Sequence, residues 1–280
     1  MANFPPQKDN IPDVLAALRE EFATSVNNVY INSLNKTYSF RDLTVLEQKT
    51  FSKLTIDHEN EPDFIYDAQC ALIKKLCTDP EFDVYSITEF DRLKIFFLIY
   101  QANFFNNSYT ITCPQCDTKF EYTLDFDSLI KTIDTFDISD VVLEHTSKNR
   151  KYEFVINFPS VKRMSDYKKY QAFQNRKNKV KSQDSSTTLI DMMDLLIKKL
   201  TITNLTTNNV IEIVPENLKY SDYVLYLETI PQSIIYSESS PIITAAKEKF
   251  AMIKKALPKV FCPNCNESIE IIGDIDGFFI

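Results

Sequence analysis

Hydrophobic positions recur at helical spacing along much of the first half of the chain. Apolar side chains stand three or four positions apart, as on the buried face of a helix. Thr44 and Glu47 have the spacing of a capping box at a helix start. The stretch SITEFDRLKIFFLIYQANFF is so apolar around its middle that we expect it to lie at the centre of the fold. Helices are predicted at residues 11–22, 43–56, 62–77 and 86–105.

Other segments alternate between apolar and polar residues, which is the pattern of strands. One predicted strand pair consists of NVYIN and TYSFR, joined by SLNK, and another of VVLEHT and KYEFVINF around SKNR. YTITCPQCDTKFEYTLDF alternates on both sides of its two cysteines. Each of these segments predicts a short antiparallel hairpin.

Helical patterns dominate again after residue 160. They predict helices at residues 161–181, 189–200, 219–230 and 244–257, with SQDSSTT (182–188) as an internal linker. We therefore predict an α+β fold, predominantly helical with short antiparallel hairpins. Its expected parts are a flexible tail (1–10), a hairpin with helices (11–107), a cysteine ribbon (108–126 with 258–280) and a mostly helical insert with a strand pair (127–257).

The composition narrows the range of functions. The 280 residues include only two glycines, Gly273 and Gly277, and carry a formal net charge of −8. Turns must then rely on Asn, Asp and Pro, and the charge opposes binding to nucleic acid or anionic membranes. Ile95–Tyr100, the longest apolar run, is far too short to span a bilayer. With no apparent leader, we expect a protein of a reducing cytoplasm.

Four cysteines fall into two CPxC pairs far apart in the chain. ITCPQCDTKF contains Cys113 and Cys116, and FCPNCNESIE contains Cys262 and Cys265. Asp117 follows the first pair and Asn266 follows the second. In zinc knuckles this position is usually a glycine in the left-handed backbone conformation. Asp and Asn tolerate that conformation best after glycine. The apolar positions beyond the cysteines also match in register, as in two hairpins of one zinc ribbon.

We expect these four cysteines to bind one structural zinc ion. Four thiolates satisfy tetrahedral zinc and leave no position for water or substrate. The alternative is two unrelated pairs of buried thiols. Cys70 and Cys77, on a predicted helix, are interpreted as core residues.

Motifs of catalysis are missing from the sequence. Two glycines cannot form a Walker loop or a dinucleotide-binding fingerprint, and no nucleophile elbow is present. Two histidines also leave few groups for proton transfer near neutral pH. We therefore predict a protein that is not an enzyme and has no small-molecule substrate. An unfamiliar carboxylate active site is the weakest alternative.

The predicted helix 161–181 contains a cluster of basic residues interleaved with aromatic ones. A solvated helix face with its aromatic side chains turned into the core is the favoured interpretation. The alternative is a surface for an acidic protein or for nucleic acid. The candidate partner-binding residues here are Lys168, Lys169, Arg176 and Lys177.

Residues 28–130 resemble a known family in the order of their segments. VYINSLNKTYSFRDLTVLEQKTF is similar to the family's opening, a strand pair followed by R-x-L-T-x-x-E-x-K and a helix. The apolar helix, short strand and CPxC knuckle that follow resemble its next stretch. The family is that of the baseplate hub assembly proteins of T4-type contractile-tailed bacteriophages. The matching motif positions are Arg41, Leu43, Thr44, Glu47 and Lys49.

The resemblance implies a viral tail protein that acts through contacts with other baseplate proteins and is made in the host cytoplasm. Whether it stays in the virion or leaves as an assembly chaperone is left open. The alternative function is a zinc-ribbon regulator that binds nucleic acid through the basic helix. Acidic residues beside the knuckles, among them Glu121 and Glu267, oppose that alternative because they repel phosphate.

The chain ends in the apolar residues Phe278, Phe279 and Ile280. Such a tip is poorly suited to solvent, and the flexible Gly273 and Gly277 precede it. It either folds back on the ribbon or inserts into another protein, and the sequence does not separate these two possibilities.

Overall fold

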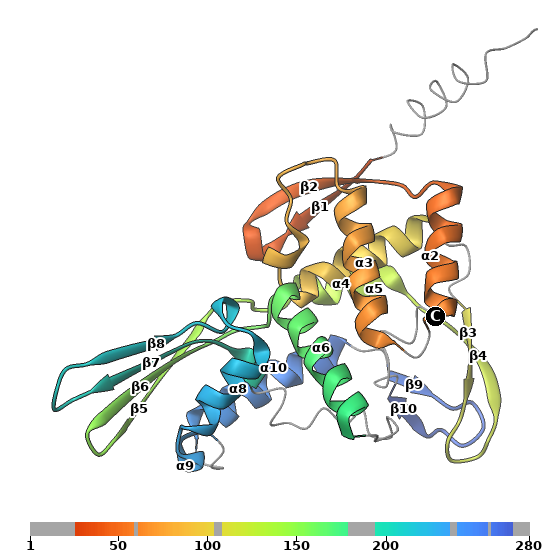
Figure 1. Cartoon of the computed structure of the whole chain (residues 1–280). Coiled ribbons are helices and arrows are strands. Elements are labelled where there is room, and N and C mark those ends of the chain that lie inside the picture. The colour runs from red at the N-terminus through yellow and green to blue at the C-terminus, as the bar shows by residue number, and fades with distance from the viewer. Residues whose placement is uncertain are drawn as a thin grey trace, which may run out of the picture.

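The fold is described from a computed structural model of the chain. The described residues are 26–58, 61–103, 108–178, 194–235, 240–256 and 259–270. The predicted tail 1–10, helix 11–22, linker 182–188 and apolar tip Phe278–Ile280 lie outside them. Figure 1 shows a helical body with a large sheet on one side and two cysteine hairpins on the other.

The first described element is an antiparallel hairpin. β1 (Val26–Ile31) pairs with β2 (Lys36–Arg41), as predicted, and the 3-10 turn η1 (Asn32–Leu34) joins them. Asn35 closes this turn at a φ of 50°. In a chain so poor in glycine, asparagine takes the left-handed position because its short polar side chain tolerates it.

Three helices follow the hairpin and form the helical body: α2 (Val45–Asp57), α3 (Pro62–Leu76) and α4 (Glu89–Asn103). The predicted capping box at Thr44 and Glu47 starts α2. The 3-10 turn η2 (Val84–Ser86) precedes α4, which is buried over most of its length and lies at the centre of the main hydrophobic cluster, as expected. Within the described residues, no helix is long and apolar enough to cross a membrane.

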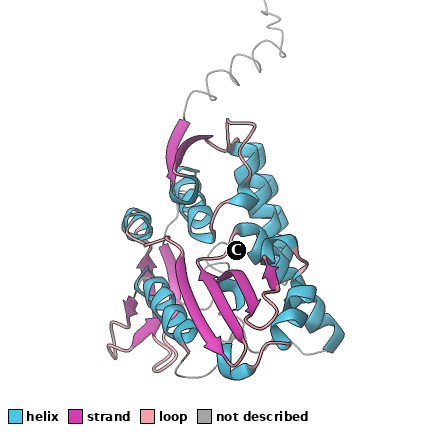
Figure 2. Ribbon diagram, turned by 90° about the vertical axis from the view of Figure 1, so that its left-hand side faces the viewer, coloured by secondary structure: helices cyan, strands magenta, loops and turns pink. Residues whose placement is uncertain are grey.

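The largest sheet has four antiparallel strands in the order β5-β6-β7-β8. Figure 2 looks onto these strands, with helices beside them. Alternate side chains of β6, among them Tyr152, Phe154 and Ile156, are buried in the main cluster. The four strands are β5 (Val141–Ser147), β6 (Arg150–Ile156), β7 (Ile197–Asn204) and β8 (Val210–Ile213).

This sheet corrects two predictions. The helix expected at 189–200 is wrong at its end, because Ile197–Leu200 begin β7. β8 was not expected at all. Together they enlarge the predicted strand pair to four strands, so the fold is a mixture of helix and sheet. The stretch LLIKKL suits a helix by its spacing, but its last four residues continue into the β-branched stretch TITN and form β7 with it, and β7 pairs with β6.

The remaining helices flank the sheet and the body. α6 matches the predicted basic helix, and α8 and α10 match the two later predictions. α10 packs against α5 and against β5 and β6. These elements are α5 (Phe126–Asp134), α6 (Val161–Asn178), the 3-10 turn η3 (Pro215–Asn217), α8 (Tyr220–Glu228), α9 (Gln232–Ile235) and α10 (Pro241–Ala256).

Candidate metal centre

Two small hairpins present the four cysteines. β3 (Ser108–Thr112) pairs with β4 (Lys119–Thr123), and β9 (Lys259–Phe261) pairs with β10 (Ser268–Glu270). Each CPxC turn lies between the two strands of its hairpin. The first cysteine of each pair, Cys113 or Cys262, follows the first strand directly and is buried.

The two turns have the same backbone hydrogen bonds. In the first turn, the Cys113 amide donates to the Thr118 carbonyl and the Asp117 amide donates to the Cys113 carbonyl, both at 2.9 Å. In the second turn, the Cys262 and Asn266 amides donate to the carbonyls of Glu267 and Cys262, again at 2.9 Å. The two cysteine segments therefore share their backbone conformation as well as their sequence pattern.

Asp117 and Asn266 adopt the left-handed conformation that the sequence predicts. Their φ angles are 54° and 56°. This conformation curls the chain after the second cysteine of each pair, so that the two thiols of one turn face the same side. The prediction made from residue type and position is confirmed at both turns.

All four sulfur atoms converge on one point. The four Sγ atoms lie within 4.8 Å of one another. Cys113 Sγ lies 3.6 Å from Cys265 Sγ, and Cys116 Sγ lies 3.6 Å from Cys262 Sγ. A tetrahedron of sulfurs each about 2.3 Å from a zinc ion has edges of about 3.8 Å. The distances between the two hairpins therefore fit four thiolates around one metal ion.

The pKa values of the thiols also favour a cation at this site. The hydrogen bond to Thr118, whose hydroxyl lies 3.2 Å from Sγ, lowers the pKa of Cys116 to about 6. At Cys265 the Glu267 amide lowers the pKa, but desolvation and the other three thiols outweigh it and raise the pKa to about 12. Four thiols this close resist full ionisation unless a cation lies among them. A bound divalent ion supplies that charge and displaces the remaining protons.

The four sulfur ligands limit the chemistry that a metal ion bound here could perform. Thiolates favour soft or borderline metals such as zinc and iron, and four of them form a closed tetrahedral shell. A closed shell has no open position for water or substrate, so the centre suits a structural role. Among the described residues, this is the one group of three or more potential metal ligands that the structure brings together.

The basic residues of α6 do not form one open patch. Lys169 Nζ pairs with Asp67 of α3 at 2.8 Å, and Arg176 reaches Asp63 of the same helix at 3.8 Å. Lys168 Nζ lies 5.2 Å from the centre of the Tyr66 ring, and Lys177 is exposed. Many of the basic side chains of α6 therefore contact acidic or aromatic side chains of α3.

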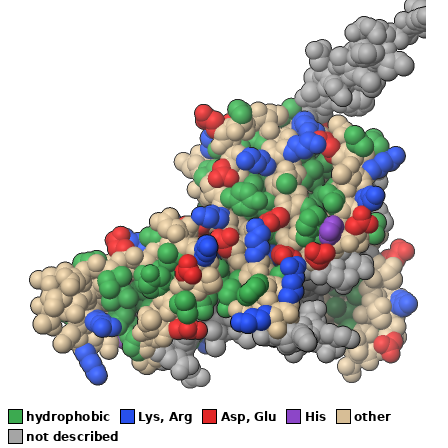
Figure 3. Space-filling model, viewed as in Figure 1, with side chains coloured by type: hydrophobic (Ala, Val, Ile, Leu, Met, Phe, Trp, Pro, Cys, Tyr) green, Lys and Arg blue, Asp and Glu red, His purple; other side chains and the backbone are tan. Residues whose placement is uncertain are grey.

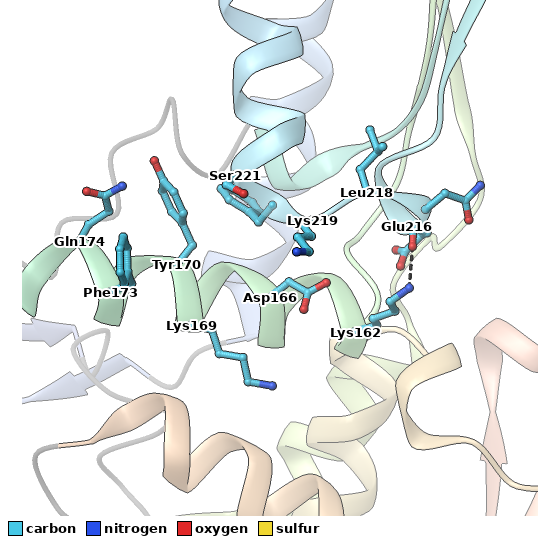
Figure 4. A pocket seen from close by; sticks show the side chains of 12 residues that line it. Lys162, Asp166, Lys169, Tyr170, Phe173, Gln174, Glu216, Leu218, Lys219 and Ser221 are labelled. Carbon is cyan, nitrogen blue, oxygen red and sulfur yellow. Dashed lines mark hydrogen bonds between the residues drawn. The ribbon is translucent and has the colours of Figure 1, made fainter. Parts of the chain in front are cut away.

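A groove of about 580 Å³ runs between α6 and the segment that leads into α8. Figure 4 shows Lys162 reaching the backbone of Glu216, whose carbonyl accepts its hydrogen bond at 2.6 Å. Tyr170 and the exposed Phe173 line the groove. The prediction that all the aromatic residues of this helix point into the core is therefore wrong for Phe173.

Arg41, Thr44 and Glu47 of the R-x-L-T-x-x-E-x-K segment form a connected cluster at the start of α2. Arg41 donates two hydrogen bonds of 2.9 Å to the Glu47 carboxylate, which also pairs with Lys75 at 2.8 Å. Thr44 completes the capping box with Glu47. The Leu43 amide donates to the Asn103 side chain at the end of α4. The spacing of Thr44 and Glu47 predicted the capping box. It could not predict that Glu47 pairs with Lys75 or that Leu43 donates to Asn103.

No family model, no curated protein and no solved structure matches this chain. Its function is therefore inferred from the chemistry of the metal centre and from the resemblance in its first half.

Proposed function

We propose that this chain is a non-enzymatic assembly protein of a contractile phage tail, acting in the baseplate hub through contacts with other tail proteins. In this proposal the four cysteines hold one structural zinc ion. The protein works in the host cytoplasm during assembly, and its partners are other baseplate proteins.

The observation that carries the proposal is the closed cysteine cluster. Four convergent thiols, two of them buried, join the middle of the chain to its C-terminal hairpin. Such a centre stabilises a shape and leaves no coordination position for a reaction. A metal-stabilised protein without catalytic motifs in its sequence is suited to presenting surfaces to other proteins.

The conformation of the motif residues supports the same proposal. Arg41, Thr44 and Glu47 hold β2 against the start of α2, and Lys75 ties this junction to α3. These residues have structural roles that explain why the motif combines a base, a hydroxyl and an acid.

The alternative, a regulator that binds nucleic acid through α6, has less support. Asp67 and Asp63 neutralise Lys169 and Arg176 at short range. The whole chain carries a net charge of −8, which opposes an approach to phosphate.

Co-expression tests the proposal. The tagged chain, expressed with the baseplate proteins of a T4-type phage, should capture at least one of them in stoichiometric amount. Mass spectrometry of purified particles then separates a virion component from an assembly chaperone. Failure to capture any baseplate protein, with folded and metal-loaded bait, would reject the proposal.

A further inference from the structure

The two cysteine turns differ at one equivalent position. Thr118 and Glu267 each come two residues after the second cysteine of their turn, and the carbonyl of each accepts a hydrogen bond of 2.9 Å from the amide of the first cysteine. Their own amides form hydrogen bonds with the sulfurs of Cys116 and Cys265. The backbone is therefore the same in both turns, and only the side chain differs, a hydroxyl in the first turn and a carboxylate in the second.

The Thr118 hydroxyl lies against the sulfur of its own turn. Its Oγ1 is 3.2 Å from Cys116 Sγ, and the Thr118 side chain is half-buried. A thiolate bound to a metal ion has no proton, so in the loaded centre the hydroxyl donates and the sulfur accepts. Hydrogen bonds to a metal ligand fix its orientation, and losing one typically lowers metal affinity about 10–100-fold.

Cys265 lacks this support and is the most accessible of the four cysteines. It is exposed, whereas Cys116 is half-buried and the other two are buried. Glu267, at the position equivalent to Thr118, is exposed, and its ionised carboxylate cannot donate a hydrogen bond to a thiolate. The hairpins lie at the lower right of Figure 3, where acidic and basic side chains face the solvent. Dissolved reagents therefore reach Cys265 before the other ligands.

The hairpin that carries Cys265 is also the smaller one. Within the described residues, β9 and β10 form three residue pairs, whereas β3 and β4 form five. Val260 of β9 is buried, but its neighbour Phe261 is 55% exposed. With fewer backbone hydrogen bonds and little apolar burial, the second hairpin depends more on the metal ion than the first does.

We propose that Thr118 is a positioning residue that holds Cys116 on the metal ion, and that Cys265 is the ligand that leaves first. The centre then opens from the C-terminal hairpin, while Cys113 and Cys116 stay bound. This inference rests on the metal centre of the proposed function and is independent of the baseplate role.

Alkylation of the zinc-loaded full chain tests the order of release. The chain is treated with less than one equivalent of N-ethylmaleimide, and peptide mass spectrometry locates the modified thiol. Because all four ligands are thiolates while zinc is bound, the order reports exposure and hydrogen bonding. We expect Cys265 to react first and Cys116 to react several-fold more slowly.

Variants at position 118 test the hydroxyl. Thr118→Val keeps the shape of the side chain without the hydroxyl. It should speed alkylation of Cys116 several-fold and weaken zinc retention about 10–100-fold in competition with a chromogenic chelator. Thr118→Ser restores the hydroxyl and should recover both properties. Thr110→Val makes the same substitution at an exposed position of β3 and should change neither.

The second turn allows the reverse experiment. Glu267→Thr places a hydroxyl at the position equivalent to Thr118 and should slow alkylation of Cys265 and strengthen zinc retention. Glu267→Val removes the same charge without adding a hydroxyl, so the difference between these two variants isolates the hydrogen bond. This comparison, like the alkylation order of the parent chain, holds even where Thr118→Val fails to fold.

Two results would overturn this proposal alone. In the first, Cys116 reacts as early as Cys265 in the zinc-loaded chain. In the second, folded Thr118→Val keeps the zinc retention and the alkylation order of the parent. A chain that binds neither zinc nor iron would instead remove the centre itself, and the metal site of the proposed function would fail together with this proposal.

Discussion

The thiols of Cys113 and Cys265 lie 3.6 Å apart although 152 positions separate them in the chain. Two short hairpins with little core of their own meet at this point. A metal ion bound there would link the region after α4 to the last described strand. Because the binding site exists only when the hairpins meet, the binding free energy of the metal contributes to folding.

Removal of one metal ligand should therefore loosen the C-terminal part of the chain. We expect Cys262→Ser to lose a stoichiometric metal ion, identified as zinc by elemental analysis of the wild-type protein, and to lose on the order of several kcal/mol of stability. Thermal unfolding with and without a chelator measures the effect. Cys77→Ser, at a cysteine outside the cluster, is the control and should keep one ion per chain. Wild-type protein with neither zinc nor iron would contradict the assignment.

The left-handed residues of the two turns provide a second prediction. Asn266 has a φ of 56°, which glycine adopts easily and valine does not. Asn266→Gly should retain the metal and the stability of the parent. Asn266→Val should cost roughly 1–2 kcal/mol and weaken metal retention, because a β-branched side chain is strained in this conformation. Competition with a chromogenic chelator distinguishes them, and equal retention by both variants would refute the role given to this position.

The cysteine centre could be predicted because its signals are local and repeated. Residue type and spacing indicated which four cysteines come together, the turn conformation and the likeness of the two hairpins. The sheet was harder to predict, because β7 forms only through pairing with β6, more than forty residues earlier in the chain. β8 has four residues, and the first three, Val210, Ile211 and Glu212, are exposed, so its pattern does not resemble a buried strand. Long-range pairing with β6 places β7, and β8 then pairs with β7 as the second strand of a local hairpin.

The junction around Glu47 shows the same limit on a smaller scale. The capping box is a contact between neighbours in sequence, and the spacing of Thr44 and Glu47 predicted it. The pairing of Glu47 with Lys75 joins two helices, and no sequence pattern connects those positions.

This junction should make stability depend on pH. The Arg41 guanidinium holds the pKa of the Glu47 carboxyl well below its usual range, with help from Lys75 and Thr44. A lowered folded-state pKa stabilises the protein above the unfolded pKa of about 4.3, and this contribution is lost as the pH falls towards the folded value. Glu47→Gln, which can still cap α2, should therefore cost about 1–3 kcal/mol at pH 7. The difference from wild type should shrink below about pH 4.

Urea unfolding at several pH values measures this difference. Glu144→Gln is the matched control, because Glu144 pairs with Lys151 at 2.7 Å on the exposed surface. It should cost less than about 1 kcal/mol at any pH. If Glu47→Gln were as mild as Glu144→Gln at pH 7, the junction would not have the stabilising role described.

The charge of α6 leads to a prediction about nucleic acid. We expect negligible binding of duplex or single-stranded nucleic acid at about 150 mM salt, because net negative charge and the pairing of α6 with α3 oppose it. Fluorescence anisotropy across a salt series measures this. Submicromolar binding, abolished by charge reversal at Lys168, Lys169, Arg176 and Lys177, would instead favour the regulator.

The apolar tip of the chain provides the last prediction. In the sequence, Phe278, Phe279 and Ile280 come after the second cysteine hairpin, and a metal ion bound there would hold a docking segment close to a fixed base. A segment anchored in this way loses less conformational entropy when it binds a partner. Under the proposed function, deletion of residues 277–280 should leave metal content and thermal unfolding nearly unchanged and abolish capture of baseplate proteins in the co-expression experiment. Replacement of the tip by three serines in the full-length chain provides the matched control for length. If either variant unfolds at lower temperature, the tip belongs to the core. If both still capture partners normally, another surface makes the contact.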